Sequence, residues 1–140
     1  MPRPPNTGYL CYMLYSMEHG KIYVGSTNNM QRRLRQHNKT NQGAKYTKKY
    51  RPWIVAATVR GFSCHKDALS FEWAWQHPQR TRHLKNYRLE GLISKCANRC
   101  FSNWYKAVYY MCDESYWYQR SIHMECVYAP PLLANRLPEI

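Results

Sequence analysis

Two apolar stretches near the start of the chain are separated by a polar turn. Residues 9–17 (YLCYMLYSM) and 21–26 (KIYVGS) are rich in aromatic and aliphatic side chains, and Glu18, His19 and Gly20 lie between them. Short apolar runs bounded by turn residues are typical of two strands joined in a hairpin. The pattern therefore predicts a β-hairpin at the start of the fold.

The segment after the predicted hairpin has apolar residues at the spacing of a helix. The polar residues 27–29 are suitable helix N-caps, and residues 30–37 (MQRRLRQH) place Met30 and Leu34 on one side of a helix. We expect a short basic helix here, followed by a lysine-rich loop over residues 39–51.

A third strand and a second helix are predicted in the middle of the chain. Residues 52–59 (PWIVAATV) are apolar and rich in β-branched side chains, which favours a strand that ends before Gly61. Ser63 can then cap a helix that runs to Pro78. On this helix four residues share one face: Ala68, Leu69, Glu72 and Trp75.

The pattern is weaker in the last third of the chain. Residues 79–88 (QRTRHLKNYR) form a second basic cluster, and a helix is expected over residues 89–98. Residues 104–112 suit either a late strand or a helix, and the proline-containing end of the chain suits an extended tail.

The length of 140 residues favours a single globular domain. We expect a flexible segment over residues 1–8 and the folded domain over residues 9–88. Residues 89–140 would form a helical or extended segment that packs on the same domain.

The charge balance points to a polyanionic partner. The chain has 21 Lys and Arg residues against 8 Asp and Glu residues, a formal net charge of +13. Such an excess favours nucleic acid first and an anionic membrane second, although basic charge can also serve solubility alone. The apolar run over residues 9–17 is too short to span a bilayer, so we expect no membrane partner.

The cysteines suggest a reducing compartment. Neither a C-x-x-C pair nor a signal-peptide pattern is present, so we expect a soluble intracellular protein with structural thiols in preference to a zinc site. The six cysteines are Cys11, Cys64, Cys96, Cys100, Cys112 and Cys126. Action in the nucleus, including that of a viral protein in an infected cell, would suit the chemistry, but we identify no clear targeting signal.

Glu72 is a lone carboxylate within the apolar segment 71–75 (FEWAW). Burying a carboxylate costs free energy unless a partner compensates its charge. The partner could be a nearby Arg or Lys, or a divalent cation whose other ligands are phosphate oxygens and waters. Because only Asp67 lies within a few residues, the sequence favours one metal ion over a two-metal cluster.

Four further residues carry candidate chemistry. Arg33 and His37 lie four residues apart on the expected basic helix, where both could meet one phosphate. A solvated basic helix face would explain the same spacing. Tyr12 and Tyr23 are equally ambiguous, since the chain has thirteen tyrosines and strand tyrosines usually pack against neighbours.

Together these residues follow the order and spacing of a known nuclease signature. The matching elements are residues 10–12 (LCY), residues 23–25 (YVG), Arg33, His37 and Glu72. They resemble the GIY-YIG endonuclease superfamily, although the first triplet keeps only its tyrosine. Residues 71–78 (FEWAWQHP) are similar to the segment around the metal-binding glutamate of the Slx catalytic subunit. Ala44, Thr47 and residues 52–53 also look like that subfamily, and the resemblance covers residues 9–82 well.

The resemblance implies a fold and a chemistry. The fold is an α/β (α+β) domain with a small mixed or antiparallel three-stranded sheet flanked by helices, followed by a short C-terminal extension. The chemistry is hydrolysis of a DNA phosphodiester bond with one divalent metal ion, Mg²⁺ or Mn²⁺, held by Glu72.

The resemblance also implies a role for each remaining motif residue. Tyr12 or Tyr23 would deprotonate or position the attacking water, and Arg33 would stabilise the charge that grows on the phosphate. His37 would orient a tyrosine or the phosphate. A tyrosine can act as a base only if its pKa falls from its usual value near 10, and the sequence does not decide which tyrosine does so.

The basic segments are expected to bind the DNA backbone. The predicted contacts are Arg32, Lys45, Tyr46, Lys48, Lys49, Arg51, Arg80 and Arg82. Tyr46, Tyr50 and Tyr87 could stack on unpaired bases at a branch, or could simply cover the edge of the core.

The protein partner of the Slx family is not evident from this sequence. Slx nuclease subunits usually carry a zinc-binding RING-type module that docks on a scaffold protein. The cysteines after Arg88 do not reproduce its paired metal-binding knuckles, so no zinc-bound RING module is expected. A scaffold protein bound in another way, or self-association, are the candidate protein partners.

Three functions fit these observations. The first, which we favour, is a structure-specific endonuclease acting on flaps, forks and Holliday-type junctions in DNA repair or recombination. The second is a nicking or homing-type enzyme on linear DNA, which residues 71–78 disfavour. The third is a non-catalytic DNA-binding module, which the presence of Tyr23, Arg33 and Glu72 disfavours.

Overall fold

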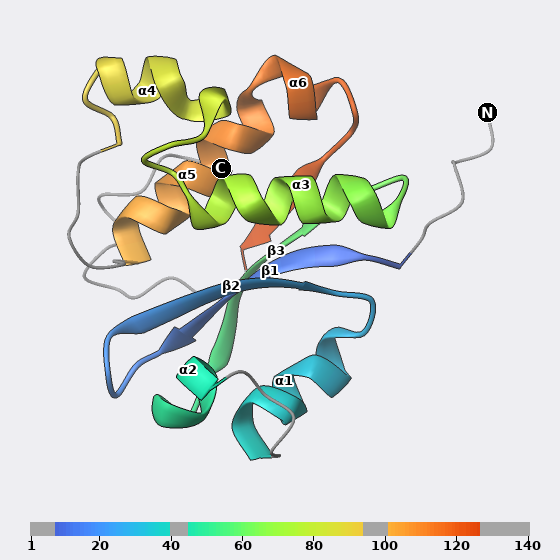
Figure 1. The fold of residues 1–140 in the computed structure, drawn as a ribbon, viewed down its shortest axis with the longest axis vertical. Coiled ribbons are helices and arrows are strands. Elements are labelled where there is room, and N and C mark those ends of the chain that lie inside the picture. Colours follow the sequence, from blue (N-terminus) through green and yellow to red (C-terminus); the bar gives the residue numbers. More distant parts are fainter. Residues whose placement is uncertain (1–7, 40–44, 94–100, 127–140) are drawn as a thin grey trace.

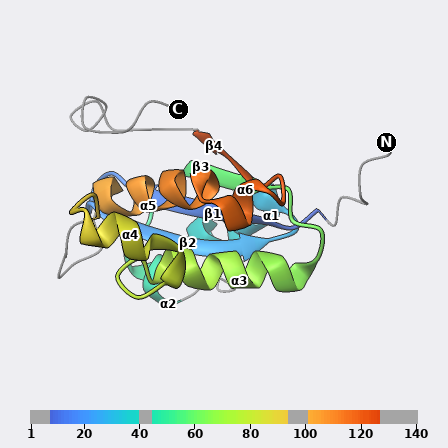
Figure 2. The same cartoon turned by 90° about the horizontal axis from the view of Figure 1, so that it is seen from above.

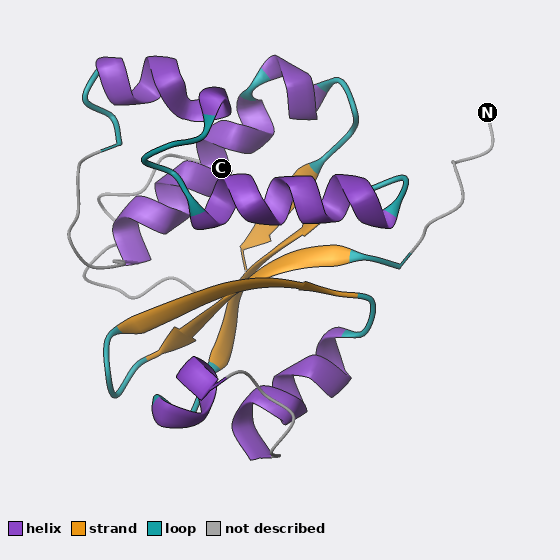
Figure 3. Ribbon diagram, viewed as in Figure 1, coloured by secondary structure: helices purple, strands orange, loops and turns teal. Residues whose placement is uncertain are grey.

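The computed structural model describes residues 8–39, 45–93 and 101–126, which form one antiparallel sheet with helices on both faces (Figures 1 and 3). The predicted class, α/β with a small sheet flanked by helices, is confirmed. In chain order the elements are β1 (Leu10–Ser16), β2 (Lys21–Thr27), α1 (Met30–Lys39), α2 (Lys45–Lys49), β3 (Ile54–Arg60), α3 (His65–Gln76), η1 (Arg82–Leu84), α4 (Lys85–Leu89), α5 (Phe101–Asp113), α6 (Ser115–Tyr118) and β4 (His123–Cys126).

The strand order in the sheet is β2-β1-β3-β4. The predicted hairpin is confirmed, because β1 and β2 pair antiparallel from Leu10 opposite Thr27 to Ser16 opposite Lys21. On its other side β1 pairs antiparallel with β3. This order leaves β2 at one edge of the described sheet, where elements from both faces can meet.

The sheet has a fourth strand in place of the three that the sequence predicts. β4 pairs antiparallel with β3, with Ala57 opposite Cys126 and Arg60 opposite His123. In the sequence, β3 and β4 are separated by most of the helices, so no local sequence pattern predicts that they pair.

The two faces of the sheet carry different helices. α3 and α5 lie side by side on one face, with α3 nearer β2, while α1 and α2 cover the other face (Figures 1 and 2). Side chains alternate between the faces along each strand. Cys11, Met13 and Val24 therefore join the core beneath α3 and α5, whereas Tyr12 and Leu14 join the smaller cluster beneath α1 and α2.

The start of α3 differs from the prediction. Its N-cap is Cys64, which makes no side-chain cap, and Ser63 instead donates a hydrogen bond to the Asp67 carboxylate at 3.2 Å. The predicted face is also shifted by part of a turn, because Leu69 is 47% exposed while Phe71 is fully buried.

Three predictions of secondary structure need correction or completion. The expected loop over residues 39–51 contains the short helix α2, and residues 104–112 are helical within α5. The helix expected over residues 89–98 is wrong where it can be compared, because α4 ends at Leu89 and turns follow to residue 93. The flexible start, the rest of that helix and the extended tail lie outside the described residues.

Three of the described cysteines carry free thiols: Cys11, Cys64 and Cys112. Burial raises the pKa of the Cys11 thiol, which donates a hydrogen bond to the Ala68 carbonyl at 3.2 Å, and raises the pKa of Cys112 to about 12. Both thiols therefore stay protonated and unreactive at neutral pH. In the part of the chain that the structure describes, no helix is both long and apolar enough to cross a membrane.

Candidate active site

Tyr12 and Gly25 face each other across the hairpin. Tyr12 is fully buried, and a Cβ atom placed on Gly25 would lie 2.5 Å from the Tyr12 hydroxyl oxygen and 2.7 Å from its Cζ. Real Cβ atoms do not approach other heavy atoms so closely. The glycine of the YVG triplet is therefore required because the phenol of Tyr12 occupies the space of its side chain.

A hydrogen-bonded chain runs from Tyr12 into α2. The Tyr12 hydroxyl lies 2.8 Å from Nε2 of His37, and Nδ1 of His37 lies 2.8 Å from the Thr47 hydroxyl. All three side chains have no exposed surface. A neutral imidazole carries one ring proton, so His37 donates to one of these partners and accepts from the other, which fixes the ring and the phenol together.

His37 is held in its neutral form. Burial lowers the pKa of His37 to about 4, and the nearby Arg33 and Arg51 guanidinium groups act in the same direction. Both ring nitrogens are engaged within the protein, so the expectation that His37 and Arg33 meet one phosphate is wrong for the histidine. The solvated-face interpretation also fails for His37, although Arg32 and Arg35 on the same helix are exposed.

Burial raises the pKa of Tyr12 above its usual value. Arg33 opposes this shift because its guanidinium is hydrogen-bonded to the phenol, while Tyr23 and Glu72 raise the pKa further. Tyr12 is therefore a protonated phenol at neutral pH. The contribution from Glu72 also shows that the helix α3 carboxylate lies within electrostatic range of the tyrosine.

Tyr23 is only partly buried and lies in a row of aromatic rings. Its ring centroid is 5.0 Å from His37, 6.3 Å from Tyr12 and 6.3 Å from Tyr46, on which it stacks. Of the two predicted catalytic tyrosines, Tyr23 is thus the one with surface open to solvent.

Five hydrogen bonds anchor α1 and α2 to residues 51–53, just before β3. Asn38 donates to the Trp53 carbonyl at 2.9 Å and accepts from the Trp53 amide at 2.7 Å. The Trp53 indole donates to the Thr47 carbonyl at 2.8 Å. Arg51 donates to the carbonyls of His37 and Gln36 at the end of α1. These contacts fix the positions of His37 and Thr47 on two different elements.

Glu72 lies on α3, on the opposite face of the sheet from Tyr12. Its Oε1 accepts a hydrogen bond from the Ser26 hydroxyl on β2 at 2.8 Å, and its Oε2 accepts one from the Gln76 amide at 3.1 Å. Gln76 also donates to the Val24 carbonyl at 2.8 Å, which ties the helix to the strand. Glu72 is thus held half-buried against edge strand β2.

The Glu72 carboxylate has no ion-pair partner among the described residues, which argues against the ion-pair interpretation. Each carboxylate oxygen has two lone pairs and uses one of them, so each can still bind a cation. In residues 8–39, 45–93 and 101–126 no three His, Cys, Asp or Glu side chains gather as a metal cluster. The site therefore fits one divalent ion held by one protein carboxylate, with other ligands supplied from outside.

The group around Tyr12 and the Glu72 carboxylate lie on opposite faces of the sheet, and both reach its edge at β2. β2 runs between α3 on one side and α1 with α2 on the other, and it carries both Tyr23 and Ser26 (Figure 1). The structure thus gathers Tyr12, Tyr23, Arg33, His37 and Glu72 around one strand.

The predicted DNA contacts differ in their exposure to solvent. Lys45, Lys48, Lys49, Arg32, Arg80 and Arg82 are exposed. Arg51 is half-buried and bonded to the end of α1, which gives it a structural task.

The tyrosines proposed to stack on bases also differ. Tyr46 and Tyr50 contact each other with ring centroids 5.1 Å apart, close to Tyr23. Lys21 and Lys49 each lie 5.3 Å from the Tyr50 ring. Tyr87 instead stacks on Tyr110 of α5 at 4.5 Å, which supports the alternative that it covers the core.

Sequence reasoning missed the roles of three supporting residues. Ser26 and Gln76 hold the Glu72 carboxylate, and Thr47 completes the chain from Tyr12. The position of Gln76, four residues after Glu72, was a usable signal because such residues are neighbours on a helix. Ser26 and Thr47 lie in segments that resemble the family, but their contacts left no local signal in the sequence, since their partners come from other elements.

Comparison with known proteins agrees with this arrangement. Residues 8–88 match the GIY-YIG catalytic domain. The chain belongs to the GIY-YIG family. This confirms the resemblance to the GIY-YIG superfamily.

Curated relatives narrow the likeness within the GIY-YIG family. The chain is 51% identical over 87 residues to structure-specific endonuclease subunit slx1 of Penicillium rubens, covering 59% of this chain and 22% of the relative. It is 53% identical over 78 residues to the protein of that name from Schizosaccharomyces japonicus, covering 54% of this chain and 29% of the relative. The matched region thus spans less than a third of these relatives.

Proposed function

We propose that this GIY-YIG protein is a metal-dependent, structure-specific endonuclease that hydrolyses phosphodiester bonds in branched DNA. The observation that carries the proposal is a carboxylate, Glu72, that has no ion-pair partner among the described residues and lies at the same sheet edge as a tyrosine and arginine group. A scissile phosphate needs positive charge on its non-bridging oxygens and an oriented nucleophile, and the edge of β2 offers both. The likeness to proteins named as structure-specific endonuclease subunits supports branched DNA as the substrate.

Glu72 would hold one Mg²⁺ or Mn²⁺ ion, which supplies charge neutralisation at the phosphate. Ser26 and Gln76 keep the carboxylate oriented. The Arg33 guanidinium is half-buried next to the Tyr12 phenol. From this position it would bind the non-bridging phosphate oxygens.

The two tyrosines receive different tasks. Tyr23 has exposed surface and would position the attacking water. As the water oxygen bonds to phosphorus, the bond from phosphorus to the leaving deoxyribose oxygen would break. The proton of the water would pass to solvent or to a phosphate oxygen, and the leaving oxygen would take a proton from solvent. Tyr12 stays protonated because burial raises its pKa, so it acts as a positioning residue within the chain of Tyr12, His37 and Thr47. In this proposal His37 would orient a tyrosine in preference to the phosphate.

The surroundings of the site supply the DNA contacts in this proposal. The exposed Lys45, Lys48 and Lys49 on α2 would bind backbone phosphates on one side of β2, and Arg80 and Arg82 would do so beyond α3. A scaffold protein or self-association would complete the assembly, since the named relatives are subunits. Repair or recombination in the nucleus is the setting in which such substrates arise.

The test compares matched substrates that share one labelled strand: linear duplex, 5′-flap and four-way junction. The purified protein is assayed with Mg²⁺, Mn²⁺ or EDTA. We expect incision close to the branch, dependent on the metal and at least tenfold slower on linear duplex. Equal incision of linear duplex would replace this function by a nicking enzyme, and tight binding without incision in either metal would replace it by a DNA-binding module.

A further inference from the structure

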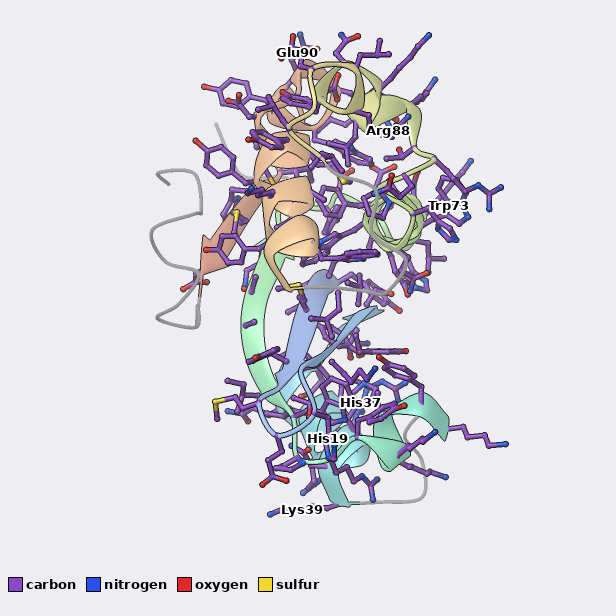
Figure 4. All side chains as sticks on the ribbon, turned by 90° about the vertical axis from the view of Figure 1, so that its left-hand side faces the viewer. His19, His37, Lys39, Trp73, Arg88 and Glu90 are labelled. Carbon is purple, nitrogen blue, oxygen red and sulfur yellow. The ribbon has the colours of Figure 1, made fainter. Side chains whose placement is uncertain are left out.

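One aromatic side chain beside the metal-binding carboxylate is left open to solvent. Trp73 is 48% exposed, whereas each of the chain's other four tryptophans is at most 6% exposed. It lies on the flank of α3 that is turned away from α5 (Figure 4). An indole that is open to solvent at this position is available for stacking on a flat ligand.

Two neighbouring side chains, His77 and Arg80, lie against the Trp73 indole. Together they form a flat surface with a positive charge beside it. The His77 ring stacks on the indole with centroids 4.4 Å apart and planes inclined by 23°. Nδ1 of His77 lies 2.7 Å from the Trp73 carbonyl oxygen, which can only accept, so Nδ1 carries the proton and the ring is fixed. The Arg80 guanidinium lies 6.0 Å from the indole centroid.

The turn that carries Arg80 is itself well anchored. The backbone amides of Arg80 and Thr81 both donate to the His77 carbonyl at 2.9 Å. Arg88 donates to the carbonyls of Pro78 and Thr81, each at 2.8 Å. The Trp73 and His77 rings and the backbone that carries Arg80 are therefore in place before any ligand arrives, which lowers the entropy cost of binding.

We propose that Trp73, His77 and Arg80, here called the Trp73 platform, bind an unpaired nucleobase of the DNA substrate and its adjoining phosphate. This inference deepens the proposed function and rests on it for the identity of the substrate. An indole face stacks on any base, and a neighbouring guanidinium suits the phosphate that follows the base.

The position of the platform relative to the site supports this choice. Glu72 and Trp73 are consecutive helical residues, so their side chains diverge by roughly 100° from neighbouring points on α3. A strand whose phosphate lies at Glu72 would pass its next nucleotides over Trp73. A base can reach the platform only if it is unpaired, which gives the enzyme a way to distinguish a branch from a continuous duplex.

The chain's charge favours DNA over a protein segment as the occupant. Arg80 flanks the indole and the chain carries a net charge of +13, so an anionic ligand is attracted to this flank. Leu69, one turn earlier on α3, is also exposed. It offers a control for a merely apolar docking surface.

Intrinsic fluorescence gives the first test, because Trp73 is the one tryptophan with substantial exposure. A thymidine dodecamer is titrated into the protein in EDTA, so that no incision occurs. We expect quenching of the emission in the wild type, and no quenching in Trp73→Phe. An unquenched wild type, or equal quenching in the variant, would overturn the proposal.

Affinity gives the second test. Trp73→Ala should bind the thymidine dodecamer and a flap with an unpaired strand about 5- to 100-fold more weakly, with unchanged affinity for blunt duplex. Leu69→Ala should bind all three like the wild type.

Equal losses on duplex and single strand would reduce Trp73 to a general contact, and a change confined to self-association in sedimentation would make this flank a protein interface. Neither the quenching nor the affinity measurement requires incision. A protein that does not cut DNA but shows the expected quenching would therefore refute the proposed catalysis and still support base binding by the Trp73 platform.

Discussion

The two faces of the sheet differ in what they bury. Beneath α3 and α5 the core is largely apolar, with the Phe71 ring in edge-to-face contact with Phe62, Trp75 and Trp117 at 5.0 to 6.0 Å. Beneath α1 and α2, Tyr12, His37 and Thr47 bury polar atoms in a hydrogen-bonded chain. Buried polar groups add little stability even when satisfied. We infer that the face beneath α3 and α5 contributes most of the stability of the fold, with Glu72 at its β2 edge as its part of the site, and that the face beneath α1 and α2 positions the other motif residues.

The largest expected effect on stability comes from the apolar face. Met111 on α5 is fully buried, so Met111→Ala should lower the free energy of unfolding by about 2–5 kcal/mol. Incision per folded molecule should stay at the wild-type level. Urea unfolding and an active-site titration measure the two quantities, with Leu69→Ala, exposed on α3, as a control expected within about 0.5 kcal/mol of wild type. Loss of activity in folded Met111→Ala would contradict the division between the faces.

The polar face should show the opposite behaviour. Arg33→Ala should slow incision about 10²- to 10³-fold, because it removes a charge that stabilises the transition state, while stability changes little. Arg35→Ala is the matched control, since Arg35 is exposed on the same helix. Single-turnover rates with saturating protein measure the effect. Similar rates for the two variants would remove Arg33 from the site.

A pH effect on stability should also come from the polar face. The pKa of His37 is about 4 in the folded protein against 6.5 for a free histidine, so the unfolded chain binds an extra proton between these values. Stability from this source is complete above pH 6.5 and falls as the pH drops towards 4, by up to about 3 kcal/mol. Urea unfolding at pH 7 and pH 4.5 should show a smaller decline in His37→Gln than in wild type. An equal decline in both proteins would mean that His37 does not stay neutral.

The smallest effect concerns the surface next to the polar face. Lys48→Gln combined with Lys49→Gln should lower the slope of log affinity against log salt by about 2, with a modest loss of affinity. The double variant Lys66→Gln and Lys85→Gln, at exposed positions away from α2, should leave the slope nearer wild type. Identical slopes in both double variants would place the DNA path elsewhere.

The sequence predicted the elements that local patterns specify. The hairpin, α1, β3 and α3 follow from apolar spacing and turn residues, and the motif residues from resemblance. α2 was missed because its five residues are mostly polar, and it is stabilised by contacts such as that between Trp53 and the Thr47 carbonyl. β4 was missed because its pairing is long-range.

The candidate site was predicted as residues but not as geometry. Periodicity could not show that Glu72 and Tyr12 lie on opposite faces of the sheet, because that depends on which face each helix covers. It could not show that His37 is enclosed, since MQRRLRQH is the sequence of a solvated helix in most other settings. The sequence did not single out Trp73 as exposed, because an aromatic residue in an apolar segment is usually buried.

The most direct test of the central claim is incision of flap and junction DNA by Glu72→Gln, with Asp67→Asn as the control. Both changes remove one negative charge from α3 with little change in shape, but only Glu72 lies against β2. We predict that Glu72→Gln loses Mg²⁺-dependent incision by at least about 10³-fold while DNA affinity is kept or slightly increased, and that Asp67→Asn cuts like the wild type. Incision by Glu72→Gln at a rate close to that of Asp67→Asn would contradict a metal site at this carboxylate and with it the proposed mechanism.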